Sequence, residues 1–116
     1  MIGSIRDRRT FQALRRHGQR VRFGPLSAVY LPGPADVEPR TRVAFAITRK
    51  VGTAVVRNRL RRRVRAVLEE SASRLPPGAL LVSLSPGAVE RSPAQLRDDV
   101  TSLLNSLDRQ LHGAAR

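Results

Sequence analysis

Six arginines lie within nine consecutive positions of this 116-residue chain, from Arg57 to Arg65. The segment that holds them, AVVRNRLRRRVRAVL, also contains apolar residues at helical spacing, namely Val56, Leu60, Val64, Val67 and Leu68. A helix with this pattern buries its apolar stripe and leaves the guanidinium groups on the rest of its surface. Because guanidinium forks match the geometry of phosphate oxygens, the segment predicts a surface that binds a polyanion.

The alternative is a helix whose charged side only contacts solvent. Such helices usually mix charges, because like charges four residues apart destabilise a helix by roughly 0.2–0.5 kcal/mol per pair. Here no acidic residue follows Thr53, the expected N-cap, until Glu69. The arginines also begin near the helix N-terminus, where the helix dipole disfavours cations. Phosphate groups would offset both penalties, so we favour a polyanionic partner.

The predicted helix carries its arginines on two surfaces, a flank with Arg57, Arg61 and Arg65 and an outward side with Arg59, Arg62 and Arg63. Asn58 lies between the first two arginines. Its amide could bond a base edge or a 2′-hydroxyl, or it could orient a neighbouring guanidinium. The sequence leaves these alternatives open.

The charge of the chain is distributed unevenly. The formal net charge is +13, and residues 1–65 carry 17 basic against three acidic residues, whereas residues 66–116 carry five against six. Such asymmetry concentrates self-repulsion in one half, which a polyanion would relieve. We therefore expect nucleic acid as the partner rather than an acidic protein or a membrane surface.

No set of residues suggests catalysis or metal binding by the protein itself. The only histidines, His17 and His112, lie near predicted helix ends and are expected at the surface. No carboxylate pair or Ser/His/Asp set stands out. The absence of cysteine excludes disulfides and thiolate metal sites and is typical of a cytoplasmic protein. No apolar run approaches the roughly 20 residues needed to span a bilayer, and none resembles a secretory signal.

The remaining segments predict a single α+β domain over residues 1–116, with one mixed sheet packed by helices. The expected elements are a helix from Ser4 or Asp7 to Gly18, two short strands broken at Gly24–Pro25, a loop over 32–40, a strand over 41–50, the arginine helix, a strand from Ala79, and a last helix begun by a Ser92–Gln95 capping box. Their order is α-β-β-β-α-β-α.

The strand over 41–50 has one apolar face and one face of small side chains. Val43, Phe45 and Ile47 alternate with Ala44, Ala46 and Thr48. The small face is either covered by a close-packed helix or forms the floor of a groove. Two of the four aromatic residues, Phe11 and Tyr30, are similarly either core residues or platforms on which unpaired bases stack.

The segment ITRKVGTAVVRNRLRRRVRAVL, residues 47–68, resembles the signature of the protein subunit of bacterial ribonuclease P. That signature has a basic pair, then V-G-N-A-V, then an RNR motif that opens a basic helix. Other segments of that family follow in the same order here, including TFQALRRHG, GPLSAVYLP, PPGALLV and a final amphipathic helix.

The resemblance implies a compact fold similar to a ribosomal-protein domain, with a left-handed crossover. It implies a subunit of a ribonucleoprotein that removes the 5′ leader from precursor tRNA. Ribonuclease P RNA and precursor tRNA are then the partners, and the RNA subunit is the catalyst. Mg²⁺ is expected as a cofactor held mainly by that RNA, with no catalytic residue or metal site on the protein. No DNA or membrane partner is expected.

The same resemblance assigns roles to individual residues. The catalytic RNA would be contacted by Arg57, Asn58, Arg59, Arg61, Arg62 and Arg65, with Arg49 and Lys50 as the basic pair near the cleft. A cleft for the single-stranded leader would be lined by Phe11, Arg15, Tyr30, Ala44, Ala46 and Thr48. Two positions depart from the family pattern: Thr53 replaces the usual asparagine, and Arg15 replaces a second aromatic. Two other classes of protein are alternatives to a ribonuclease P subunit: a ribosomal protein without a leader cleft, and a DNA-binding protein of the nucleoid. The RNR motif disfavours both.

Overall fold

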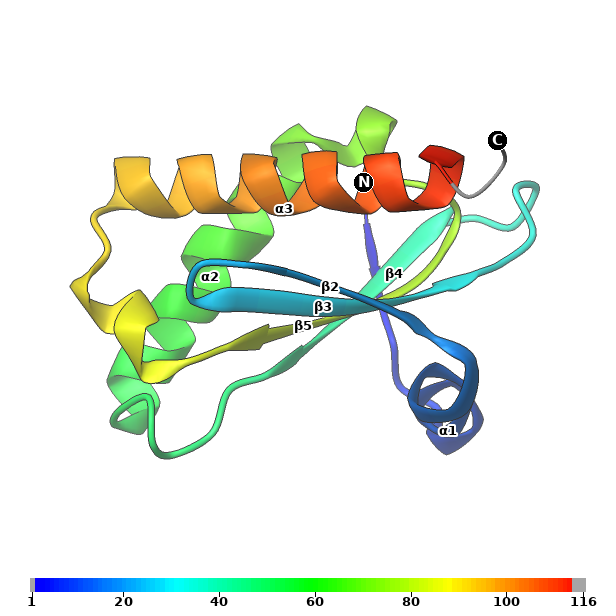
Figure 1. Ribbon diagram of the computed structural model, residues 1–116. Coiled ribbons are helices and arrows are strands. Elements are labelled where there is room, and N and C mark those ends of the chain that lie inside the picture. The colour runs from blue at the N-terminus through cyan, green and yellow to red at the C-terminus, as the bar shows by residue number, and fades with distance from the viewer. Residues whose placement is uncertain (1, 114–116) are drawn as a thin grey trace.

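Two of the three helices cover one face of a five-stranded sheet, and the first helix packs on the other face (Figure 1). The computed structural model describes residues 2–113. Its elements are β1 (Gly3–Ser4), α1 (Arg8–His17), β2 (Gln19–Phe23), β3 (Leu26–Pro32), β4 (Thr41–Ala46), α2 (Ala54–Glu70), η1 (Ala72–Arg74), β5 (Gly78–Leu84), η2 (Pro86–Glu90) and α3 (Pro93–Gly113). The predicted α+β class and the order of the three helices and four longer strands are confirmed.

The strand order in the sheet is β1-β4-β5-β3-β2. The β2–β3 and β3–β5 pairs are antiparallel, while β1–β4 and β4–β5 are parallel, so the sheet is mixed as expected. The sequence did not predict β1, because two residues carry no periodic pattern. Since β4 and β5 are parallel neighbours joined through α2, the expected crossover is present, and its left hand stays a prediction.

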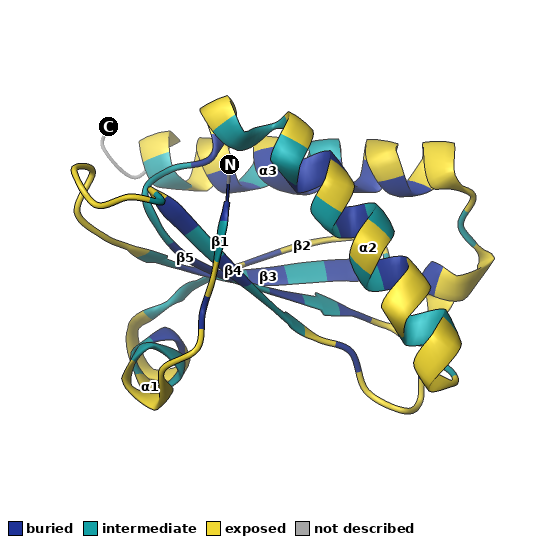
Figure 2. Cartoon of the chain, turned by 180° about the vertical axis from the view of Figure 1, so that it is seen from behind, coloured by how far each residue is buried: buried dark blue, intermediate teal, exposed yellow. Residues whose placement is uncertain are grey.

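The main core lies between the sheet and the two helices α2 and α3. The predicted apolar stripe of α2 is buried at Leu60, Val64, Val67 and Leu68, with Val56 packed at its edge. The stripe of α3 is buried from Leu96 to Leu107, and Leu111 packs against it. In Figure 2 both helices show buried residues toward the sheet and exposed residues away from it. The capping box is also confirmed, because Ser92 and Gln95 exchange backbone-to-side-chain hydrogen bonds of 2.9 and 3.1 Å.

Two glycines fix the course of the chain around β2. Gly24 has φ = +56°, a conformation that favours glycine, and it turns the chain between β2 and β3. Gly18 ends α1 in an extended conformation, not the left-handed one common at helix ends. Its small size is needed because a Cβ there would overlap Val29 on β3 and the carbonyl of Leu14.

The second, smaller core lies under α1. It contains Ile5, Leu14 and Ala79, with neighbouring apolar residues from α1 and the strands packed against them. Asp7, one of the two expected N-caps, begins α1: its carboxylate accepts a 2.9 Å hydrogen bond from the backbone N–H of Thr10. This core holds α1 at one end of the sheet face and leaves the other end of that face open.

Candidate RNA-binding surfaces

The arginines of α2 form the first candidate surface. Arg59 and Arg62 are exposed, and the other four, Arg57, Arg61, Arg63 and Arg65, are half-buried. Within residues 2–113, ion pairs join Arg42 to Asp7, Arg91 to Asp99, Arg97 to Glu70 and His112 to Asp108, and none involves an arginine of α2. The positive charge of this helix is therefore not neutralised by the described part of the protein.

Asn58 orients one of these arginines. Its side-chain carbonyl accepts a 2.5 Å hydrogen bond from Nη1 of Arg61, one helical turn later. One of the predicted roles, orientation of a neighbouring guanidinium, is therefore present in the structure. The expectation that the guanidinium groups lie at the surface is wrong in part for Arg57: its Nε is buried and has no hydrogen-bond partner among residues 2–113. The residue as a whole is half-buried.

The turn before α2 links this helix to the sheet. Thr53 caps the helix as predicted, since its hydroxyl accepts a 3.3 Å hydrogen bond from the backbone N–H of Val56. This capping role explains how threonine replaces asparagine there, because both are good N-cap residues. Arg49 and Lys50 are exposed in the turn between β4 and α2. Basic side chains thus continue from the end of β4 to the arginines of α2.

The second candidate surface is the sheet face on which α1 lies, called here the outer face. Strand register sets which side chains share it. The row Arg22, Ser27, Ser83 and Ala46 runs across four strands, and the next row is Arg20, Val29, Leu81 and Ala44. Residues between them, such as Val21 and Val82, are buried toward α2 and α3. The outer face therefore combines small, hydroxyl and arginine side chains.

The residues expected to form a leader cleft fall into three environments. Phe11 is half-buried and packs on the core under α1, and Arg15 is exposed on the same helix. Ala44 on β4 is also packed into this core. Of the two alternatives for the small face of β4, cover by a helix therefore applies at Ala44. Ala46 and Thr48 are exposed beyond it. The small face of β4 is therefore covered at one end and open at the other.

Tyr30 does not line this surface, and the prediction that it does is wrong. Its side chain is 4% exposed and lies in the main core, on the face of the sheet opposite α1. Its hydroxyl donates a 2.7 Å hydrogen bond to the carbonyl of Pro77, and burial raises the pKa of this tyrosine. Alternation along β3 places Val29 and Leu31 beneath α1 instead. In a strand, a difference of one residue exchanges the two faces of the sheet, so neighbouring positions of β3 differ in which core they face.

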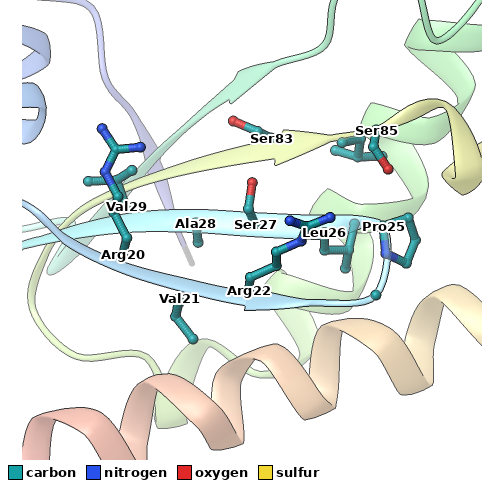
Figure 3. Close-up of a pocket in the computed structure, with 12 residues that line it drawn as sticks. Arg20, Val21, Arg22, Pro25, Leu26, Ser27, Ala28, Val29, Ser83 and Ser85 are labelled. Carbon is teal, nitrogen blue, oxygen red and sulfur yellow. The ribbon is translucent and has the colours of Figure 1, made fainter.

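The open end of the outer face forms a hollow of about 540 Å³ (Figure 3). It is lined by Arg20, Val21, Arg22, Gly24, Pro25, Leu26, Ser27, Ala28, Val29, Ser83, Leu84 and Ser85. Figure 3 shows Ser27, Ser83 and Arg20 on one side of the strands, while Val21 points toward α3. The hollow lies at the β2–β3–β5 end of the sheet, not over β4, where the resemblance predicts the cleft floor.

Four lining residues of this hollow were missed by sequence reasoning. Arg20 and Arg22 flank the buried Val21, and Ser27 and Ser83 are the polar residues within two apolar strands. That alternation was a usable signal, since polar residues on one face of an otherwise apolar strand mark the side away from the core. Within residues 2–113, neither arginine forms an ion pair.

Three further observations concern metal-ligand groups, membrane-spanning helices and the histidines. In the described part of the chain, no group of three His, Asp or Glu side chains is arranged to hold a metal ion. Over the same residues, no helix is long and apolar enough to cross a membrane. Both His17 and His112 are exposed, as predicted.

A family model described as Ribonuclease P matches residues 3–108, which is most of the chain. The chain belongs to the ribonuclease P protein family. The ribonuclease P protein component of Streptomyces avermitilis is 37% identical over 97% of this chain and 94% of its own length. The corresponding protein of Synechococcus sp. is 41% identical over 90% of this chain and 80% of its own. The chain is therefore an RNA-binding subunit of ribonuclease P, the partner of ribonuclease P RNA within an endoribonuclease ribonucleoprotein.

Solved ribonuclease P proteins have the same fold. The Staphylococcus aureus protein matches with a TM-score of 0.79 and 19% identity, covering 88% of this chain and 92% of its own. The Thermotoga maritima protein matches with a TM-score of 0.76 and 22% identity, covering 87% and 94%. These matches support the fold predicted for the family and give no support to the alternative of a ribosomal protein.

Proposed function

We propose that this ribonuclease P protein binds the single-stranded 5′ leader of precursor tRNA on its outer face. On this proposal the arginines of α2 bind ribonuclease P RNA. The observation that carries it is the position of the unpaired basic residues. They include the arginines of α2, Arg20 and Arg22 at the open end of the outer face, and the exposed Arg49–Lys50 turn that leads into α2. Exposed arginines of α1, such as Arg15, lie beside the same face.

The two surfaces suit different forms of RNA. A helix with closely spaced guanidinium groups binds phosphates without reading bases, as needed for docking on a folded RNA. The outer face carries the small side chains of Ser27, Ser83 and Ala46 at its open end, and the half-buried ring of Phe11 lies under α1 at its covered end. On this proposal an extended strand crosses this face and places a base against that ring. Arg15, one turn after Phe11, supplies a guanidinium that can contact phosphate or stack on a base.

Cleavage itself is assigned to the RNA subunit. We propose that Mg²⁺ is held mainly by that RNA and that the protein positions the substrate by binding its leader. The protein would act in the cytoplasm, where its RNA partner and precursor tRNA are made in bacteria. On this basis the protein alone should not cleave precursor tRNA, and adding a bacterial ribonuclease P RNA with Mg²⁺ should give cleavage at the mature 5′ end. Reproducible cleavage at that position by RNA-free protein would contradict the assignment.

The decisive experiment compares substrates with and without a leader. The reconstituted holoenzyme should bind precursor tRNA with a long leader more tightly than mature tRNA. Phe11→Ala should weaken binding of the long-leader substrate by roughly 1–3 kcal/mol, the usual contribution of one base–aromatic stack, and should not change binding of mature tRNA.

Phe11→Leu serves as the matched control for packing. Leucine restores apolar contact with the core under α1 but provides no ring for stacking, so it should show the same leader-specific loss with a smaller effect on protein stability. Equal losses on both substrates would mean that Phe11 only packs the domain and that the leader binds elsewhere.

A further inference from the structure

The hollow at the open end of the outer face contains two serines side by side. Ser27 on β3 and Ser83 on β5 are directly opposite in the antiparallel register, which places their Cβ atoms about 5 Å apart. Figure 3 shows both hydroxyls on the side of the strands away from α3. Among residues 2–113 neither hydroxyl has a hydrogen-bond partner. Two free hydroxyls therefore face the hollow.

Two arginines flank this serine pair along the edge strand β2. Arg22 is directly opposite Ser27, and Arg20 precedes it by two residues on the same face. Strand geometry separates the two Cα atoms by about 7 Å. Both residues are exposed, and neither forms an ion pair within residues 2–113. The hollow thus offers hydroxyl groups at its floor and guanidinium groups at its edge.

That combination has the chemistry of a ribonucleotide site. Guanidinium groups bind phosphate oxygens, which RNA and DNA share. A hydroxyl can both donate and accept, as the ribose 2′-hydroxyl can, and that group distinguishes RNA from DNA. Within the hollow, no aromatic ring or amide side chain is present to read a base. The site therefore suits recognition of sugar and phosphate without sequence preference.

We propose that the hollow is a ribose-selective subsite for the single strand, in which Ser27 and Ser83 bind 2′-hydroxyl groups while Arg20 and Arg22 bind the adjoining phosphates. This inference rests on the proposed binding of the leader to the outer face. It extends that face past α1 to β2, so the occupant is the part of the leader distant from α1. The protein would then distinguish a ribonucleotide leader from a deoxyribonucleotide strand by its 2′-hydroxyl groups.

The test measures the affinity of the reconstituted holoenzyme under non-cleaving conditions for three substrates. They are mature tRNA, precursor tRNA with a long ribonucleotide leader, and the same precursor with a 2′-deoxy leader. The nucleotide next to the cleavage site stays a ribonucleotide in both leaders. Wild-type protein should prefer the ribose leader by about 2- to 10-fold, the range expected for the net gain of a hydrogen bond.

Three variants assign the preference. The double variant Ser27→Ala/Ser83→Ala should lose the preference by weakening only ribose-leader binding. Ser73→Ala is the matched control, because Ser73 is an exposed serine in η1, outside the hollow, and it should keep the wild-type preference. Arg22→Ala should weaken both leaders by the same factor. Thermal melting checks that each variant is folded, and the two single serine variants replace the double if it is not.

The outcomes separate this inference from the proposed function. A double serine variant that keeps the full ribose preference overturns the inference, and so does wild-type protein that binds both leaders equally. In either case tighter binding of a leader than of mature tRNA would leave the proposed function standing. If wild-type holoenzyme binds the long-leader substrate no better than mature tRNA, the proposed function itself fails.

Discussion

Replacing Arg59 by alanine should weaken assembly with ribonuclease P RNA and at the same time make the free protein more stable. Arg59 is exposed on α2, with Arg62 and Arg63 three and four residues later. Removing it relieves two like-charge contacts, each of roughly 0.2–0.5 kcal/mol. Alanine also has the higher helix propensity. The free energy of unfolding should therefore rise by about 0.4–1 kcal/mol.

The expected loss of binding follows from counterion release. Each phosphate contact contributes about 0.7–0.9 to the slope of log K against log salt, depending on whether the strand is single or double. If Arg59 makes one contact, that slope should become shallower by this amount. The advantage of wild-type protein over the variant should then shrink about threefold between 50 and 200 mM salt, a fourfold change in concentration. Binding titrations at several salt concentrations measure the slope, and urea denaturation measures stability.

Arg109→Ala is the control, because it removes the same charge from α3, where Arg109 is exposed and hydrogen-bonded to Ser106. It should leave the salt slope unchanged. Val64→Asp is the control for a loss of stability. Val64 is 1% exposed, so an unpaired carboxylate at this position should unfold the domain. If Arg59→Ala lowered stability toward that of Val64→Asp, or left the salt slope as in Arg109→Ala, the arginines of α2 would not be an RNA-binding surface.

Three further substitutions test the framework that holds these surfaces. Arg91→Ala should destabilise the protein by about 2–4 kcal/mol in urea denaturation, because it removes the bidentate partner of the Asp99 carboxylate, which is 4% exposed. Adding Asp99→Asn to this variant should restore part of the lost stability. Tyr30→Phe should cost about 0.5–1.5 kcal/mol, the net contribution of one hydrogen bond, because the carbonyl of Pro77 still accepts from the backbone N–H of Gly33; leader affinity should be unchanged. Hydrogen bonds from the first turn of α1 hold the pKa of Asp7 below 3.8, so its stabilising contribution is complete above that pH and is lost as the pH falls through the lowered pKa. Thermal melts at acidic pH should show this loss in wild-type protein and not in Asp7→Asn.

The sequence predicted the helices well because their signals are local. The apolar stripe of α2 with Thr53 as its cap, and the Ser92–Gln95 capping box of α3, each depend on residues within a few positions of one another. The same holds for the alternation along β4. These patterns determine which side of each element is buried whatever the rest of the chain does.

The candidate site was harder to predict because it depends on which strands become neighbours. Ser27 and Ser83 are 56 positions apart, and only the β3–β5 pairing places them together. The family resemblance assigned Tyr30 to the leader surface, but a difference of one position along a strand moves a side chain to the other face of the sheet. The burial of Asp99 was not predicted either. Its ion-pair partner, Arg91, lies before α3, so the pair is not part of the periodic pattern of that helix.

The position of α1 explains how one small domain can carry two candidate RNA-binding surfaces without losing its core. Helices α2 and α3 pack on the face of the sheet opposite the outer face, so the main core does not need the outer face. The short helix α1 covers only one end of that face through Leu14 and its neighbours, and the other end can hold small polar and basic residues. Arginines on β2 and on α2 repel one another at low salt, and a bound RNA would relieve this repulsion while neutralising both groups. Raising the salt concentration should therefore favour the folded free protein and disfavour its complex with RNA, because the same unpaired charges act in both equilibria.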